Sequence, residues 1–182
     1  IGRGALASGY RSFAFGSAGK DSTGSVTGVA YAKGNYSFAI GQGSRSIGTG
    51  SFAIGLADTA KGGYSTAIGY LSSSNGEFST SIGYFSKSKG RYSVAMGTEA
   101  NAKGQYSAAI GSSSNATGYL SVALGPSAAI GDRSVAIGSY ANANGYASVS
   151  FGDGTFANGE FSFASGDGTK ASGQYSVAMG RM

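Results

Sequence analysis

The sequence contains no cysteine, no histidine and no tryptophan, and it has a single proline among its 182 residues. The lack of cysteine excludes disulfides and thiolate nucleophiles, and the lack of histidine excludes imidazole bases, Ser-His-Asp triads and most zinc or copper sites. The eight acidic residues are dispersed and form no evident carboxylate pair. We therefore predict that the chain is not an enzyme and carries no cofactor or metal.

Long apolar runs and charged residues are also scarce. No stretch of about 20 apolar residues occurs, so no transmembrane helix is predicted. Charged residues make up 12% of the chain, and the net charge is +5. Residues 1–103 hold ten basic and four acidic residues, whereas residues 104–182 hold three and four. The basic first part favours weak attraction to acidic partners. A content of charged residues as low as this argues against nucleic acid as a partner.

Glycine is what the sequence has in abundance, with 34 residues. Collagen is excluded because its glycines are accompanied by frequent proline. A disordered low-complexity chain is disfavoured because 41% of the residues are hydrophobic, among them 12 tyrosines and 10 phenylalanines. The chain is therefore expected to fold.

A short phrase, clearest as Tyr92-Ser93-Val94-Ala95-Met96-Gly97, returns every fourteen residues, with one thirteen-residue step near Pro126. The glycine that closes the phrase and a second glycine seven residues before it keep this register throughout. The serines that mark the successive copies are Ser37, Ser51, Ser65, Ser79, Ser93, Ser107, Ser121, Ser134, Ser148, Ser162 and Ser176. Such regularity indicates a repeat protein.

The first part of the chain is less regular. Ser12 to Gly16 is a good copy, but residues 17–35 match poorly, and residues 24–28 form a degenerate copy. We interpret residues 1–35 as irregular N-terminal turns or a cap and residues 36–182 as regular repeats. The alternative for the irregular part is a small insertion. The whole chain, residues 1–182, is predicted to be a single domain.

Large and small side chains alternate within the phrase, which is typical of a β-strand. Tyr92, Val94 and Met96 are expected on one face of this strand, and Ser93 and Ala95 on the other. After the closing glycine a second, weaker alternation begins. The second glycine is expected to permit a tight reversal into the next copy.

In the second alternation Ala100 and Ala102 point one way, and Asn101 and Lys103 point the other. Each copy is therefore strand, turn, strand, turn in fourteen residues. A unit so short must stack on its neighbours, which predicts an all-β fold, a parallel β-solenoid with about 4.8 Å between turns and a length of about 60 Å.

A coil this narrow favours small side chains inside, so we assign Ser93, Ala95, Ala100 and Ala102, with their equivalents, to the interior. The reverse assignment is also compatible with the pattern. An exposed stripe of large apolar side chains would aggregate, which favours a homo-oligomer that buries it. The candidate interface residues are Tyr92, Val94, Met96, Tyr106, Ile110, Val122, Leu124, Val135 and Ile137.

The complete phrase Ser134-Val135-Ala136-Ile137-Gly138, followed by small-x-small-x-Gly, resembles the head repeat of trimeric autotransporter adhesins, the YadA-like heads of Gram-negative bacteria. The resemblance covers residues 36–180 closely and residues 1–35 loosely. It implies a left-handed parallel β-roll in each chain and a homotrimer. It also implies display on the bacterial surface above a coiled-coil stalk and an outer-membrane β-barrel, with this sequence supplying only the head.

Heads of this kind bind host extracellular matrix proteins such as collagen, fibronectin or laminin, host-cell receptors, or other bacterial cells. The resemblance therefore implies that the chain is an adhesin. The shortened repeat around Pro126 and the poor match at residues 17–35 depart from the family pattern and leave the local geometry open.

Residues 70–103 provide the candidate ligand-binding surface. Two consecutive copies place large side chains directly after the closing glycine, where most copies have Ser, Thr or Asp, and basic residues follow on outward positions. Aromatic anchors beside cations are typical of binding hot spots. The candidate residues are Tyr70, Leu71, Tyr84, Phe85, Lys87, Lys89, Arg91 and Lys103. The alternative is that the aromatic residues pack on a neighbouring chain and that the basic residues keep the protein soluble.

Two weaker patterns also have a simpler explanation. Lys33, Lys61, Lys89 and Lys103 share one repeat position, which suits either a heparin-like polyanion or an ordinary solvated face. The two Gly-Asp-Gly-Thr segments, which begin at Gly152 and Gly166, lack the dense acidic pattern of calcium-binding repeats, so we interpret them as turns.

Adhesion through many weak contacts is the leading hypothesis, since a repeated surface gains strength by multivalency. A structural spacer or a phage-fibre segment built from the same repeat is the main alternative. An ice-binding solenoid would need a flat threonine-rich array, and the chain has too few suitable threonines. A polysaccharide-cleaving solenoid would need paired acids, which the dispersed acidic residues do not offer.

Overall fold

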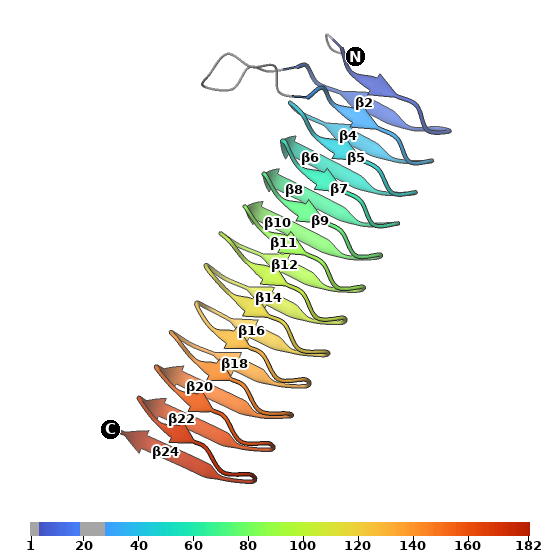
Figure 1. The fold of residues 1–182 in the computed structure, drawn as a ribbon. Helices are drawn as coiled ribbons and strands as arrows, with labels where there is room; N and C mark the ends of the chain where they lie inside the picture. Colours follow the sequence, from blue (N-terminus) through green and yellow to red (C-terminus); the bar gives the residue numbers. More distant parts are fainter. Residues whose placement is uncertain (1–3, 19–27) are drawn as a thin grey trace. The chain divides into compact units, whose positions relative to one another are not determined.

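The computed structural model describes residues 4–18 and 28–182, which divide into two compact units, residues 1–92 and 93–182. In both units the chain forms short β-strands that pair in parallel with the strands of the next turn (Figure 1). Odd-numbered strands make one sheet, sheet A, and even-numbered strands make the other, sheet B. This arrangement confirms the predicted all-β parallel solenoid with turns of about fourteen residues.

Within residues 1–92, the strands of sheet A are two residues long and those of sheet B are three or five residues long. Sheet A contains β1 Leu6–Ala7, β3 Tyr31–Ala32, β5 Arg45–Ser46, β7 Thr59–Ala60, β9 Ser73–Ser74 and β11 Lys87–Ser88. Sheet B contains β2 Phe13–Phe15, β4 Phe38–Ile40, β6 Phe52–Leu56, β8 Thr66–Tyr70 and β10 Thr80–Tyr84.

Residues 93–182 repeat this plan. Sheet A contains β13 Asn101–Ala102, β15 Asn115–Ala116, β17 Ala128–Ala129, β19 Asn142–Ala143, β21 Phe156–Ala157 and β23 Lys170–Ala171. Sheet B contains β12 Val94–Met96, β14 Ala108–Ile110, β16 Val122–Leu124, β18 Val135–Ile137, β20 Val149–Asp153, β22 Phe163–Asp167 and β24 Val177–Arg181.

The chain passes between the sheets at two edges. At the B–A edge it leaves sheet B and enters sheet A, as at residues 85–86, and at the A–B edge it returns, as at residues 75–79. In Figure 1 the arrowheads of the labelled strands of sheet B point to the B–A edge, and the rounded turns on the other side form the A–B edge.

The strand register follows the repeat found in the sequence. Ile68 pairs with Ile82, fourteen residues on. Val122 pairs with Val135, which places the thirteen-residue step inside an otherwise regular ladder. Phe13 pairs with Phe38, an offset of 25 residues that exceeds the usual fourteen by eleven. The irregular first part is therefore one regular turn followed by an insertion. The degenerate copy expected at residues 24–28 falls, apart from Gly28, outside the described residues.

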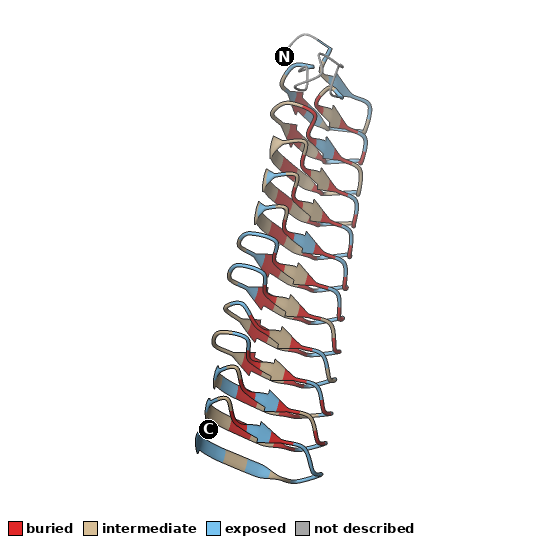
Figure 2. Ribbon diagram, turned by 60° about the vertical axis from the view of Figure 1, so that its left-hand side comes forward, coloured by how far each residue is buried: buried red, intermediate tan, exposed pale blue. Residues whose placement is uncertain are grey.

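In the described residues, alanine and serine side chains line most of the coil interior, as predicted, with exceptions at Asp58, Thr155 and Thr169. A regular turn points four of them inward, two from each strand region, and Figure 2 shows buried positions as short red segments that recur from turn to turn. Ser93, Ala95, Ala100 and Ala102 are all fully buried, so the assignment of the small residues to the interior is confirmed.

Many of the buried serine hydroxyls have a hydrogen-bond partner inside the coil, whereas those of Ser37 and Ser134 have none within the described residues. Burying a hydroxyl is costly unless it is hydrogen-bonded. In the turn that contains β10 and β11, the hydroxyls of Ser81 and Ser86 lie 2.8 Å apart, and the hydroxyl of Ser88 lies 3.0 Å from that of Ser74 in the preceding turn. These contacts link the two sheets and successive turns, so the polar interior supports the coil.

The two glycine columns are required for different reasons. Gly69, which ends the phrase, has φ of 137°, a conformation that L-residues rarely adopt, and a Cβ there would lie 2.2 Å from the Gly83 carbonyl oxygen. Gly76, of the second column, has no positive φ, but a Cβ there would lie 2.0 Å from the Gly90 carbonyl oxygen. The second glycine is needed for close approach of the next turn and not, as the sequence suggested, for conformational freedom in a reversal.

The aromatic residue that opens the phrase lies in a turn and not in the strand. Phe78 has φ of 54°, and the Ser79 N–H donates to the Gly76 carbonyl at 3.3 Å, as in turns with a left-handed third residue. The Ser79 hydroxyl donates to the same carbonyl at 2.6 Å. Tyr92 and Tyr106, each with φ of 57°, take the same position, so placing them on a strand face was wrong. The left-handed residue interrupts the alternation before β12 and β14 begin.

Candidate functional site

Two strands of residues 1–92 carry the aromatic side chains predicted to bind a ligand. β8 and β10 continue past the closing glycine, whereas β4 ends at Ile40 just before it. Because Tyr70 and Tyr84 are register partners at the ends of these longer strands, their rings stack, with centroids 5.1 Å apart and an angle of 11° between the planes. Tyr70 is 37% exposed and Tyr84 is 49% exposed.

Phe85 completes this group, which we call the aromatic edge patch and define as Tyr70, Leu71, Tyr84 and Phe85. The Phe85 ring meets Tyr84 edge to face at 4.6 Å and Tyr70 at 5.7 Å. Its N–H donates to the Tyr70 carbonyl at 2.9 Å, and the Leu71 N–H donates in the same way to Leu56. The backbone ladder therefore fixes the patch at the B–A edge.

The basic residues predicted beside these aromatic side chains are only partly brought together with them. Lys87 is exposed on the outward side of β11, two residues beyond Phe85, and Lys89 is exposed after that strand. Arg91 lies at the other edge, where its Nε contacts Glu77 Oε2 at 3.0 Å and its guanidinium lies 5.1 Å from the centroid of the Tyr92 ring. Lys103 is exposed in the second unit, residues 93–182.

The candidate interface residues of residues 93–182 gather on the outward face of sheet B. Val94 and Met96 of β12 pair with Ala108 and Ile110 of β14. The same two columns continue through Val122 and Leu124 to Val135 and Ile137. These side chains are half-buried or exposed in the single chain, with Ile110 at 41%. Tyr106 lies outside this face, in its turn. A contact between chains through this face stays a prediction.

A second aromatic group at the A–B edge of residues 1–92 was missed. The rings of Tyr64, Phe78 and Tyr92 stack at 5.3 and 5.0 Å, with nearly parallel planes. All three residues have positive φ, which is uncommon for bulky residues. The signal was present in the sequence: Gly50 takes the same repeat position, and a glycine there indicates a left-handed conformation.

A buried carboxyl group was also missed. Asp58 points into the coil at a position that holds Ser44 and Ser72 in the adjacent turns, and it is fully buried. Its Oδ1 accepts hydrogen bonds of 2.7 Å from both the N–H and the hydroxyl of Ser72. Its Oδ2 has no hydrogen-bond partner within the described part of the chain. Burial raises the pKa of Asp58 above its ordinary value, and the hydrogen bonds from Ser72 offset this only in part.

This raised pKa gives a pH-dependent prediction for stability. The folded protein binds a proton at Asp58 more tightly than the unfolded chain does, so its contribution to stability is greatest below the ordinary value of 3.8. It falls as the pH rises through the raised pKa and is constant above it. Asp58→Ser, which copies the neighbouring turns, is expected to increase the free energy of unfolding by about 1–3 kcal/mol near neutral pH.

Urea unfolding of both proteins across the acidic range would measure this effect. The difference between them should shrink toward low pH. Wild-type protein whose stability relative to Asp58→Ser increases as the pH rises would contradict the prediction.

Other chemistry is sparse. Among residues 4–18 and 28–182, no three His, Cys, Asp or Glu side chains are placed to hold a metal ion. No helix suited to crossing a membrane occurs in that part of the chain. At the Gly-Asp-Gly-Thr segments, Gly154 and Gly168 have φ of 59° and 70° in the turns that follow β20 and β22.

Comparison with known proteins places this geometry among adhesin heads. The family profile described as YadA head domain repeat (2 copies) matches residues 1–18, 32–56, 60–86, 88–114, 129–155 and 157–181, which is most of the chain. A similar solved structure is the collagen-binding domain of the Yersinia adhesin YadA, with 27% sequence identity and a TM-score of 0.54. The match covers 93% of this chain and 80% of that one. No curated protein matches the sequence.

Proposed function

The chain belongs to the YadA head domain repeat family, and from this premise we propose that it binds host extracellular matrix or host-cell surface molecules on the bacterial cell surface. The family consists of adhesin heads and not of enzymes, which confirms the prediction that the chain is not an enzyme. We further propose that three chains, each a left-handed roll, assemble as a homotrimer. A repeated lateral surface in three copies would engage an extended ligand by multivalency.

The observation that carries this proposal is the aromatic edge patch. Tyr70, Tyr84 and Phe85 are in ring contact, are held by backbone hydrogen bonds, and are partly open to solvent. Aromatic anchors of this kind supply much of the binding energy in protein interfaces. Lys87, exposed two residues beyond Phe85, adds a positive charge for an acidic partner. The similarity to a collagen-binding domain makes collagen the first matrix protein to test, followed by fibronectin and laminin.

Replacing Phe85 tests whether the patch binds. Because Phe85 has φ of 54°, asparagine, which tolerates this conformation, is the substitution least disruptive to the backbone. Phe85→Asn is expected to weaken binding to immobilised matrix proteins at least about tenfold, the effect of losing a hot-spot side chain. Surface plasmon resonance with the full chain would measure the change, and Tyr84→Ser should act in the same direction.

Tyr64→Asn is the matched control, since Tyr64 is an exposed, stacked aromatic residue with φ of 53° at the opposite edge of the same unit. It should leave binding unchanged. Equal losses in Tyr64→Asn and Phe85→Asn would disprove a site at the patch. Wild-type protein that binds no matrix protein, receptor or cell would favour the spacer or phage-fibre alternative.

A further inference from the structure

The thirteen-residue turn lacks one specific residue. In the regular turns of residues 93–182, two residues separate the closing glycine from the next inward side chain, and the second of them has positive φ, as in Glu99, Ser113 and Tyr140. In the short turn only Pro126 lies between Gly125 and the inward Ser127. The residue with positive φ is therefore the one that is absent, and the column of outward side chains at the B–A edge has a gap between Ser113 and Tyr140.

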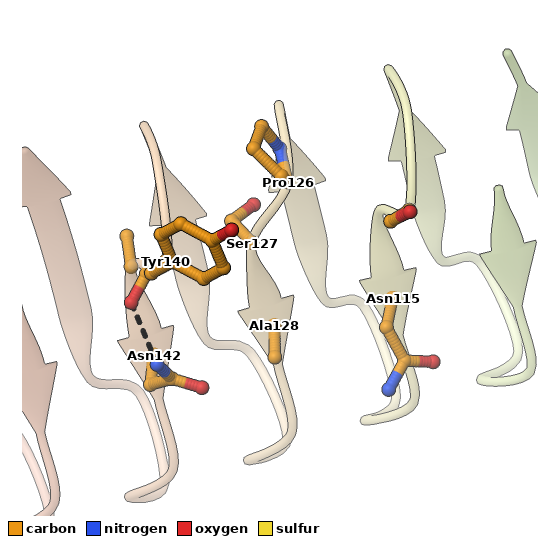
Figure 3. A pocket seen from close by; sticks show the side chains of 8 residues that line it. Asn115, Pro126, Ser127, Ala128, Tyr140 and Asn142 are labelled. Carbon is orange, nitrogen blue, oxygen red and sulfur yellow. Dashed lines mark hydrogen bonds between the residues drawn. The ribbon is translucent and has the colours of Figure 1, made fainter. Parts of the chain in front are cut away.

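A second change in the same turn deepens this gap. The outward position of sheet A holds asparagine in β13, β15 and β19, but alanine in β17. Ala128 pairs with Asn115 on one side and Asn142 on the other, so the two amides flank a small side chain and their Cα atoms are about 10 Å apart. The result is a hollow of about 200 Å³ with Ala128 and Ser127 among its lining residues. Figure 3 shows Asn115 and Asn142 on either side of Ala128, and the Tyr140 ring extending toward Pro126 and Ser127.

The lining groups favour a ligand with one apolar face and several hydroxyls. Tyr140 is 70% exposed, and its ring contacts no other aromatic ring among the described residues, so a ring face is open for stacking. The Asn142 amide nitrogen donates to the Tyr140 carbonyl at 2.7 Å, which leaves its oxygen as an acceptor. The Asn115 oxygen accepts from Asn101 at 3.3 Å, which leaves its amide nitrogen as a donor. Concave sites that combine apolar surface with a few directed polar groups are typical ligand sites.

No charged residue lines the hollow. An anionic or cationic ligand would lose hydration there without gaining an opposite charge, which is unfavourable. We propose that this hollow binds one uncharged sugar unit of a glycan, with the pyranose C–H face on Tyr140 and its hydroxyls on Asn115 and Asn142. This site uses none of the residues of the aromatic edge patch, so it goes beyond the matrix-binding function.

Saturation-transfer NMR on the full chain would test the proposal, with the methyl glycosides of glucose, galactose, mannose and N-acetylglucosamine as probes and methyl glucuronide as an anionic probe. At least one neutral probe is expected to bind with millimolar affinity and to receive magnetisation on its C–H face. Tyr140→Ala should weaken that binding about tenfold. Ala128→Asn, which restores the residue of the neighbouring turns and fills the hollow, should weaken it to the same extent.

Tyr175→Ala serves as the control, because Tyr175 is 69% exposed in the same unit but stacks on Phe161 away from the hollow. It should leave sugar binding unchanged, and circular dichroism should show all three variants folded. The proposal is overturned if no neutral probe binds, if methyl glucuronide binds more tightly than the neutral probes, or if Tyr140→Ala and Ala128→Asn bind as wild type. Because Phe85→Asn should not affect sugar binding, failure here and failure of matrix binding are distinguishable.

Discussion

Gly76→Ala is expected to lower the free energy of unfolding by at least about 3 kcal/mol, because overpacking against backbone is poorly relieved by side-chain movement. The added Cβ would lie 2.0 Å from the Gly90 carbonyl oxygen and 2.5 Å from its carbonyl carbon. The next turn would have to move away, and the parallel hydrogen bonds of that turn would lengthen. Thermal unfolding should show a decrease in Tm of roughly 6–12 °C for a chain of this size.

Gly63→Ala is the matched control for this substitution. Gly63 lies in the same unit and next to a glycine of the second column, but a Cβ there would meet only the Thr49 carbonyl oxygen, at 3.9 Å. Because its φ is not positive, alanine should be neutral or stabilising by up to about 1 kcal/mol. If the two variants have equal Tm values, close approach of the turns is not what requires the second glycine column.

Ile110→Asp is expected to convert the proposed homotrimer into monomers. Ile110 lies on the outward face of sheet B between Met96 and Leu124, and a charge placed there would be buried without a partner in each of three chains. An unpaired buried charge costs about 3–5 kcal/mol. Light scattering on the wild type should give three times the chain mass of 17.9 kDa, and on the variant a single chain mass.

Asn101→Asp introduces the same charge on the outward face of sheet A and should leave the mass unchanged. A wild-type mass of one chain would contradict the homotrimer. If the variant still has three times the chain mass, the outward face of sheet B is not part of the interface, although the chains do form a trimer.

The repeat, the parallel pairing and the interior could be predicted because all three depend on the spacing of small residues. Ser93 and Ala95 alternate with larger side chains over a strand, and the same spacing in every copy fixes the register. A side-chain pattern with period two also sets which face is inward, because a slip of one residue would bring every large side chain into a coil too narrow for it.

The turn conformations could not be predicted in the same way. Tyr92 precedes a strand, and tyrosine favours extended structure by propensity. The predicted strand therefore included Tyr92. The left-handed conformation at this position is set by the reversal and by the serine that hydrogen-bonds to the glycine, as Ser107 does to Gly104 at 2.7 Å. The candidate site was affected too, since this reversal places Arg91 at the edge opposite Phe85.

Residues that depart from the repeat inside the coil were not predicted either. Asp58 lies three repeats before Ala100, at a position that was assigned to the interior, so the fourteen-residue register already indicated a buried carboxyl group. It was missed because the adjacent turns have serine there and suggest no charge. The hollow at Ala128 likewise depends on one missing residue and one small residue in the same turn. The repeat predicts the features that recur, whereas both proposed sites use positions that differ between turns.

The two edges of the coil differ in how they accept changes of length. At every A–B edge five residues separate a strand of sheet A from the next strand of sheet B. This holds from the first such connection, between Ala7 and Phe13, to the last, between Ala171 and Val177. The B–A edge carries both irregular connections: the one between β16 and β17 is one residue shorter than usual, and the one between β2 and β3 is eleven residues longer than usual. A gene encoding this fold can therefore gain or lose codons at the B–A edge while the strands of both sheets keep the same side chains inward and outward. New recognition loops can be acquired there without redesign of the scaffold.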